Sequence, residues 1–166
     1  MPPAAVETYE DLIYYEYAKL IAAAADMEGN YGFIMDRMQK LAAGEIEMSD
    51  VVREDRYQLQ DGFEECIYCG ATENLTFDHL VPTSEGGPDI ISNQVPACQS
   101  CNSSKGAQDV IEWYQTRETS IPRLVWGKYL KLKYDTYEQE GMLDEELPDA
   151  ERDKWSGLDV DRSARS

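Results

Sequence analysis

Two pairs of cysteines are the residues of this chain whose spacing points most directly to chemistry. Cys66 and Cys69 form one CxxC pair, and Cys98 and Cys101 form the other. Two residues between the members of each pair let both sulfurs face one point, as tetrahedral zinc requires. Because cysteine fills all four positions, the predicted zinc has no open coordination site and is expected to be structural. Redox-active CxxC pairs are the weaker alternative, because no thioredoxin-like βαβ pattern surrounds either pair.

Between and beside these pairs lie residues that suit a second, catalytic metal. Asp78 precedes His79, the only histidine in the chain, and Asn102 directly follows the last cysteine. Carboxylate and amide oxygens suit Mg²⁺ or Mn²⁺ better than zinc, and histidine exchanges a proton with water near neutral pH. Lys105, one helical turn beyond Asn102, is expected to contact a substrate phosphate. Together these groups supply what phosphodiester hydrolysis needs, although each alone has a plainer structural explanation.

A strand, a turn and a helix must bring these side chains together. Residues 75–77 predict a short strand that delivers Asp78 and His79, and residues 85–88 have the composition of a turn. The second cysteine pair then begins a helix that carries Asn102. Neighbours on a regular strand point to opposite faces, so Asp78 and His79 share a site only if the strand bends or ends there.

The order of these landmarks resembles the HNH endonuclease family. The chain reads CxxC, then DHLVP with SEGG, then Asn93, and then CxxCN followed by a lysine three residues on. The resemblance implies a ββα-metal finger braced by the four-cysteine zinc and acting on DNA as an endonuclease or nickase. It implies that His79 is the general base and that Asp78 and Asn102 hold a catalytic Mg²⁺ or Mn²⁺. It also implies that Asn93, which alone would be taken for a turn residue, braces the hairpin loop and orients the histidine.

Helical patterns flank this motif on both sides. Thr8 and Asp11 predict the start of a helix over about residues 8–26. A second helix is expected to stop at Gly44, and Ser49 can cap a short third one. After the motif, helices are predicted over 107–116 and from Ser120 to Gly141, the latter with Pro122 in its first turn.

These patterns predict an α+β, mostly helical chain with a central ββα zinc module between helical flanks. We expect four segments: an N-terminal helical segment (1–62), the HNH zinc module (63–118), a C-terminal helix that packs on the module (119–141), and an acidic, mobile tail (142–166). No run of apolar residues is long enough for a transmembrane span, and no secretory signal is visible at the N-terminus. A cytoplasmic location is therefore expected. A homodimer or a larger complex is left open.

The net charge of −18 is unusual for a protein expected to bind DNA. Residues 1–65 carry −10, residues 66–134 carry −1 and residues 135–166 carry −7, so the acid lies in the flanks. An acidic protein is repelled by nucleic acid at long range. Three explanations remain open: a high-salt cytoplasm, an acidic tail that covers the DNA-binding face, or a local basic face. The basic face would consist of Lys105, Arg117, Arg123, Lys128, Lys131 and Lys133. The strong acidity also keeps a second function open, a non-catalytic zinc-binding module for protein or nucleic-acid interaction.

Overall fold

The computed structural model describes residues 3–48, 65–87, 93–117 and 119–162. Within these ranges the chain is mostly helical and carries two small sheets, which confirms the predicted α+β, mostly helical class. It divides into two compact units. We call Met1–Val52, Leu130–Leu158 and Arg162–Ser166 the helical unit, and Arg53–Tyr129 with Asp159–Asp161 the hairpin unit. The short helix predicted from Ser49 lies outside the described residues.

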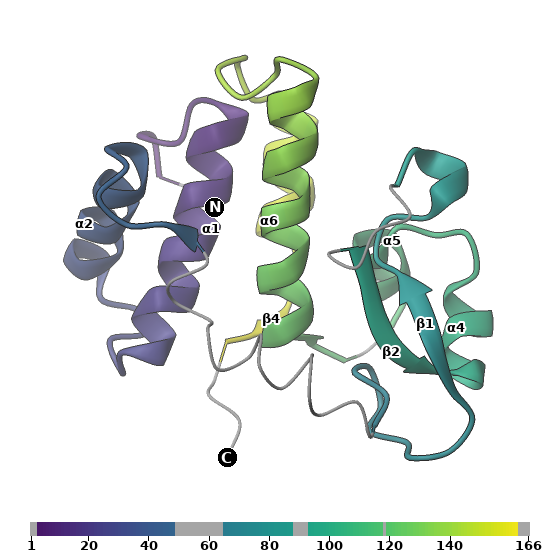
Figure 1. Cartoon of the computed structure of the whole chain (residues 1–166). Coiled ribbons are helices and arrows are strands. Elements are labelled where there is room, and N and C mark those ends of the chain that lie inside the picture. The colour runs from purple at the N-terminus through teal and green to yellow at the C-terminus, as the bar shows by residue number, and fades with distance from the viewer. Residues whose placement is uncertain (1–2, 49–64, 88–92, 118, 163–166) are drawn as a thin grey trace. The chain divides into compact units, whose positions relative to one another are not determined.

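The helical unit is built first on a pair of helices, α1 (Tyr9–Ala24) and α2 (Tyr31–Ala42), which lie side by side (Figure 1). Helix α1 begins as predicted, because Thr8 and Asp11 each accept a hydrogen bond from the other's backbone N–H, at 3.1 and 3.2 Å. Helix α2 begins at Asn30, whose side chain caps it. Gly44 follows its end with a positive φ of 76°, as the predicted stop requires. The buried apolar residues of the two helices include Leu12, Ile13, Tyr17, Leu20, Ile34, Met38 and Leu41.

The acidic C-terminal segment is folded as far as residue 162, which corrects the prediction of a mobile tail over 142–166. It contains helix α7 (Asp149–Ser156), whose Trp155 side chain is only 4% exposed. A β-bridge also joins Glu146 to Thr8, at the start of α1. One buried aromatic side chain and backbone contacts with the distant N-terminus hold the segment in place. Neither can be predicted from its acidic composition.

A buried carboxylate ties the same segment to α1. Glu16 is 3% exposed and forms ion pairs with Lys19 at 2.8 Å and with Arg162 at 3.2 Å. A buried charge is tolerated where opposite charges compensate it. Arg162 therefore contributes to the core of the helical unit although it stands in the most acidic part of the sequence.

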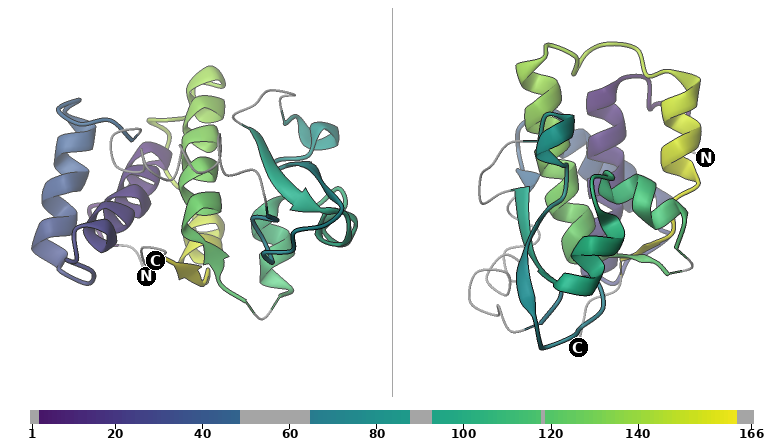
Figure 2. Two further views of the ribbon diagram at one scale, coloured as in Figure 1. Left: turned by 60° about the horizontal axis from the view of Figure 1, so that its bottom comes forward. Right: turned by 90° about the vertical axis from the view of Figure 1, so that its right-hand side faces the viewer.

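The hairpin unit is centred on strands β1 (Leu75–His79) and β2 (Gln94–Cys98), which pair antiparallel. The register sets Leu75 opposite Cys98 and His79 opposite Gln94. Helix α4 (Gln99–Lys105) follows β2 without a loop and contacts both strands (Figure 2). The strand, strand and helix expected from the sequence are therefore present.

The hairpin unit also contains a short helix and a second small sheet. Helix α5 (Val110–Gln115) is shorter than the predicted 107–116, because Asp109 caps it. Strand β3 (Ile121–Pro122) pairs in parallel with β4 (Val160–Asp161). Pro122 is therefore the end of an edge strand, where its missing N–H costs little, and not the first turn of the next helix as predicted.

Helix α6 (Arg123–Gln139) follows β3 directly and ends before Gly141, the predicted stop. Its residues up to Tyr129 belong to the hairpin unit, where the Tyr129 hydroxyl donates to Asp109 at 3.1 Å. From Leu130 onward the helix belongs to the helical unit, and the expectation that the whole helix packs on the zinc module stays a prediction. No helix in the described part of the chain is both long and apolar enough to cross a membrane.

Replacement of Trp155 by alanine tests whether the acidic segment is part of the core. We expect Trp155→Ala to lower the free energy of unfolding by about 3 kcal/mol, because it leaves a large cavity. Tyr31→Ala is the matched control, since Tyr31 is 59% exposed, and we expect it to change stability by about 0.5 kcal/mol or less. Urea unfolding followed by circular dichroism measures both. Equal unfolding curves for Trp155→Ala and the unsubstituted chain would show that the segment does not stabilise the fold.

Candidate active site

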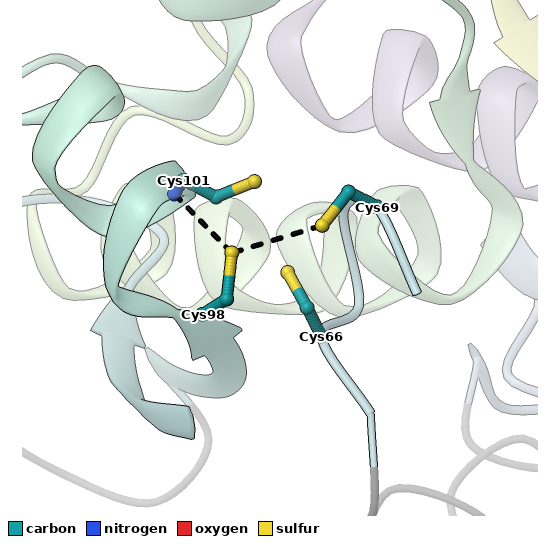
Figure 3. Close-up of side chains that lie close together, drawn as sticks. All are labelled: Cys66, Cys69, Cys98 and Cys101. Carbon is teal, nitrogen blue, oxygen red and sulfur yellow. Dashed lines mark hydrogen bonds between the residues drawn. The ribbon is translucent and has the colours of Figure 1, made fainter. Parts of the chain in front are cut away.

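The four cysteines come together at one point (Figure 3). Their sulfurs all lie within 4.8 Å of one another, and the sulfurs of Cys69 and Cys98 are 3.7 Å apart. A zinc ion bound by four thiolates at about 2.3 Å would set neighbouring sulfurs about 3.8 Å apart. In the described part of the chain this is the one cluster of three or more cysteine, histidine or acidic side chains close enough to share an ion. The cluster therefore fits a four-cysteine zinc site.

Tight backbone geometry presents each cysteine pair. The first pair lies in a turn closed by hydrogen bonds from Gly70 N–H to Cys66 O at 2.9 Å and from Cys66 N–H to Ala71 O at 2.8 Å. The second pair spans the junction of β2 and α4, where the Cys98 sulfur caps the helix by accepting the Cys101 N–H at 3.4 Å. That N–H lowers the pKa of the Cys98 thiol to about 7. Near neutral pH Cys98 is therefore prepared to bind a metal as a thiolate.

Asp78 lies inside the hairpin unit, and a hydrogen bond and an ion pair meet on the same carboxylate oxygen. Its Oδ2 accepts the Tyr68 hydroxyl at 2.7 Å and lies 3.2 Å from Lys105 Nζ. The Asp78 side chain is 5% exposed and the Lys105 side chain is fully buried. Burial, followed by the charge of Asp78, raises the pKa of Tyr68 well above its ordinary value, so the phenol remains a donor.

His79 is the last residue of β1 and is half-buried. Its backbone carbonyl accepts a hydrogen bond from Lys105 Nζ at 2.7 Å. The strand ends at His79. Such an end was expected, because neighbouring side chains on a continuing strand point to opposite faces, and Asp78 and His79 could not then share a site. Lys105 thus contacts both residues of the Asp78–His79 pair.

Asn93 is completely buried and binds the backbone just after the histidine. Its Oδ1 accepts the Val81 N–H at 3.0 Å, its Nδ2 donates to Val81 O at 2.9 Å, and its own carbonyl accepts the Leu80 N–H at 2.9 Å. Three hydrogen bonds thus fix the chain that leaves β1. This is the geometry of a brace for the segment that follows His79.

The two positions of the SEGG motif that carry glycine require it for different structural reasons. Gly86 ends the short 3-10 helix η2 (Thr83–Glu85) with a φ of 87°, which favours glycine. Gly87 has no room for a side chain, because a Cβ there would lie 1.9 Å from the Val81 carbonyl oxygen. Val81 is the residue that Asn93 binds, so Gly87 and Asn93 hold the same piece of backbone.

The remaining predicted residues differ in their placement. Asn102 is half-buried on α4, one residue after Cys101. Lys105 ends the same helix, but its ammonium group is engaged by Asp78 and by the His79 carbonyl. This geometry does not support the expected contact of Lys105 with a substrate phosphate. A buried Lys105 also cannot belong to the basic face suggested by the sequence. A buried lysine cannot be recognised from spacing alone, because its partner stands far back in the sequence.

Tyr68 is a site residue that the sequence interpretation missed. It lies between the two cysteines of the first pair, and its ring packs edge-on against Trp113 of α5 with centroids 4.9 Å apart. Its position inside a CxxC pair was the one available signal, since residues there are held close to the metal. Nothing in the sequence indicated that its hydroxyl reaches Asp78.

Comparison with known proteins agrees with this arrangement. Residues 66–108 match the family described as HNH endonuclease. The match begins at the first cysteine of the cluster and includes β1, β2 and α4. No curated protein and no solved structure matches the chain. Residues 66–108 are therefore similar to an HNH module, and this similarity suggests a nuclease or a nucleic-acid-binding module.

The steric role of Gly87 can be tested by adding one methyl group. We expect Gly87→Ala to destabilise the protein by about 2 kcal/mol or more, because the Cβ would overlap the Val81 carbonyl. The control is Gly32→Ala in α2, where the nearest atom to a new Cβ is an Asn30 side-chain oxygen at 3.6 Å and no loss is expected. Thermal unfolding measures both variants. Equal melting temperatures for the two would contradict the close approach.

The cysteine cluster can be tested through the metal itself. We expect the purified chain to carry one zinc ion and Cys98→Ser to lose it and unfold the hairpin unit, because zinc binding contributes on the order of 10 kcal/mol to such folds. Ser100→Ala is the control, since Ser100 is exposed between Cys98 and Cys101, and it should retain the zinc. Metal content is measured by mass spectrometry and folding by circular dichroism. A Cys98→Ser protein with full zinc and unchanged unfolding would rule out the proposed ligand set.

Proposed function

We propose that this protein is a metal-dependent endonuclease or nickase that hydrolyses DNA phosphodiester bonds. One observation carries the proposal: Asp78 and His79 end strand β1, which contacts the helix that carries Asn102, inside the segment that matches the HNH endonuclease family. An acid and an imidazole at the end of a strand, and an amide on the helix that contacts this strand, offer the chemistry that metal-assisted hydrolysis requires. The four-cysteine cluster has no open position and is assigned a structural role.

The residues present are compatible with a hard divalent cation on Asp78 and Asn102. The hydrogen bond from Tyr68 and the ion pair with Lys105 both go to Asp78 Oδ2, and no hydrogen bond from the described chain goes to Oδ1. Two protein oxygens would leave most positions to water and substrate, which is how Mg²⁺ commonly binds. When bound, Mg²⁺ or Mn²⁺ would supply positive charge to the scissile phosphate and to the departing 3′-oxygen.

His79 is the proposed general base. It would take a proton from the attacking water, a step for which the imidazole must be held in one place. The backbone at His79 and directly after it supports that requirement, since Lys105 holds its carbonyl and Asn93 fixes the two residues that follow it. Asn93 would thus contribute by orienting the histidine, without contact with the substrate.

A non-catalytic zinc module is the second candidate, and two observations favour it. The Asp78 side chain is almost fully buried, and one of its oxygens already carries a hydrogen bond from Tyr68 and an ion pair with Lys105. The net charge of −18 also opposes approach to nucleic acid at low salt. A module of this kind would bind a protein or a nucleic acid and would not cleave DNA.

Plasmid nicking separates the two candidates. We expect the purified chain to nick supercoiled plasmid with Mg²⁺ or Mn²⁺, EDTA to stop the reaction, and His79→Ala to reduce the rate by about 10²–10⁴-fold, the usual contribution of general-base catalysis. Thr76→Ala is the matched control, because Thr76 lies on the exposed part of the same strand, and it should cleave normally. Both variants should retain zinc.

The assay is best run over a range of salt concentrations, because screening weakens long-range repulsion between an acidic protein and DNA. Nicking that survives in a clean His79→Ala preparation would eliminate His79 as the base. Absence of nicking by the unsubstituted chain at every salt concentration, with zinc and fold intact, would favour the non-catalytic module.

A further inference from the structure

Lys105 is buried although it carries a charge, and its burial needs a physical explanation. A charged side chain loses its hydration when it is buried, and a well-packed apolar replacement is often neutral or stabilising. The Lys105 side chain nevertheless has no exposed surface, and its partner Asp78 is 5% exposed. Its ammonium group therefore depends on two acceptors, the Asp78 carboxylate and the His79 carbonyl.

Three elements meet at this buried cluster. Tyr68 comes from the first cysteine turn, Asp78 and His79 from β1, and Lys105 from the end of α4. The Tyr68 and Lys105 donors share Asp78 Oδ2, at 2.7 and 3.2 Å. A carboxylate held twice through one oxygen has a fixed orientation, and its other oxygen receives no hydrogen bond from the described chain.

We infer that Tyr68 and Lys105 are positioning residues that hold Asp78 so that Oδ1 is the oxygen left to bind a divalent cation. This inference rests on the proposed function, because Asp78 is the proposed ligand. The partners of a metal-binding carboxylate orient it and tune its affinity. Lys105 also fixes the His79 backbone, so one side chain aligns the proposed ligand and the proposed base.

The Tyr68 hydroxyl can be removed with little change in packing. Tyr68→Phe keeps the ring against Trp113 and removes one donor from Asp78. Tyr114→Phe is the matched control: Tyr114 belongs to the same aromatic cluster, and its buried hydroxyl makes no hydrogen bond within the described residues. The full-length, zinc-loaded chain is used for both variants.

We expect Tyr68→Phe to weaken Mn²⁺ binding, measured by electron paramagnetic resonance of free Mn²⁺, by about tenfold. The single-turnover cleavage rate at saturating Mn²⁺ should fall by about 10–100-fold. Zinc content and the dissociation constant for DNA should not change. Tyr114→Phe should match the unsubstituted chain in all four measurements. A Tyr68→Phe protein that binds Mn²⁺ and cleaves as the unsubstituted chain does would overturn the inference.

Lys105→Met distinguishes positioning from a phosphate contact. Positioning predicts a lower cleavage rate, with the DNA affinity and its dependence on salt unchanged. A direct phosphate contact predicts weaker DNA binding and a salt slope smaller by about one, and that result would overturn the assignment of Lys105. If Lys105→Met does not fold, Tyr68→Phe still tests whether the orientation of Asp78 matters for Mn²⁺ binding.

The two levels of the account fail in different ways. If the unsubstituted chain cleaves with Mn²⁺ and Tyr68→Phe equals it, only the positioning role is overturned. An unsubstituted chain that neither binds Mn²⁺ nor cleaves DNA overturns the proposed function, and the inference falls with it.

Discussion

The meeting of four cysteine sulfurs within 4.8 Å is the constraint on which the rest of the hairpin unit depends. Four thiolates at this distance repel one another unless a cation binds them, and a two-stranded hairpin is only marginally stable alone. The cluster joins the turn at Cys66 to the junction of β2 and α4. A bound zinc would therefore fix the relation between the strand that carries His79 and the helix that carries Asn102.

A second, buried set of contacts converts that scaffold into a specific arrangement of side chains. Lys105 lies one helical turn after Cys101 and reaches back to both Asp78 and His79. Tyr68 reaches the same carboxylate from between the other two cysteines. Each cysteine pair thus brings one donor to Asp78, so the structural site and the proposed catalytic strand are mechanically linked. Through Tyr68, the turn that holds the first cysteine pair therefore contacts the end of β1.

The sequence predicted what depends on local spacing and composition. The cysteine cluster follows from two CxxC pairs, β1 from an apolar stretch before Asp78, and the start of α1 from Thr8 and Asp11. Each of these signals lies within a few residues of the structure that it specifies. The roles proposed for Asp78, His79, Asn93 and Asn102 rest on the resemblance to a family and stay predictions.

What the sequence could not predict depends on partners far apart in the chain. Lys105 looked like a phosphate contact because it is a lysine beside a proposed site, and its burial follows from Asp78. The acidic C-terminal segment was expected to be mobile because its composition is charged and polar. Its attachment depends instead on the burial of Trp155 and on a β-bridge to Thr8. Pro122 suggested a helix start, but the pairing of β3 with β4 places it in a strand. Tertiary contacts override local preference in all three cases.

The central claim is that one metal builds the module and a different metal serves cleavage. The most direct measurement is DNA cleavage by protein that retains one zinc ion after weakly bound divalent ions have been removed. The account predicts no cleavage in that state, full activity after addition of Mg²⁺ or Mn²⁺, and constant zinc content throughout. Cleavage by the zinc-loaded protein with no response to Mg²⁺ or Mn²⁺ would contradict it.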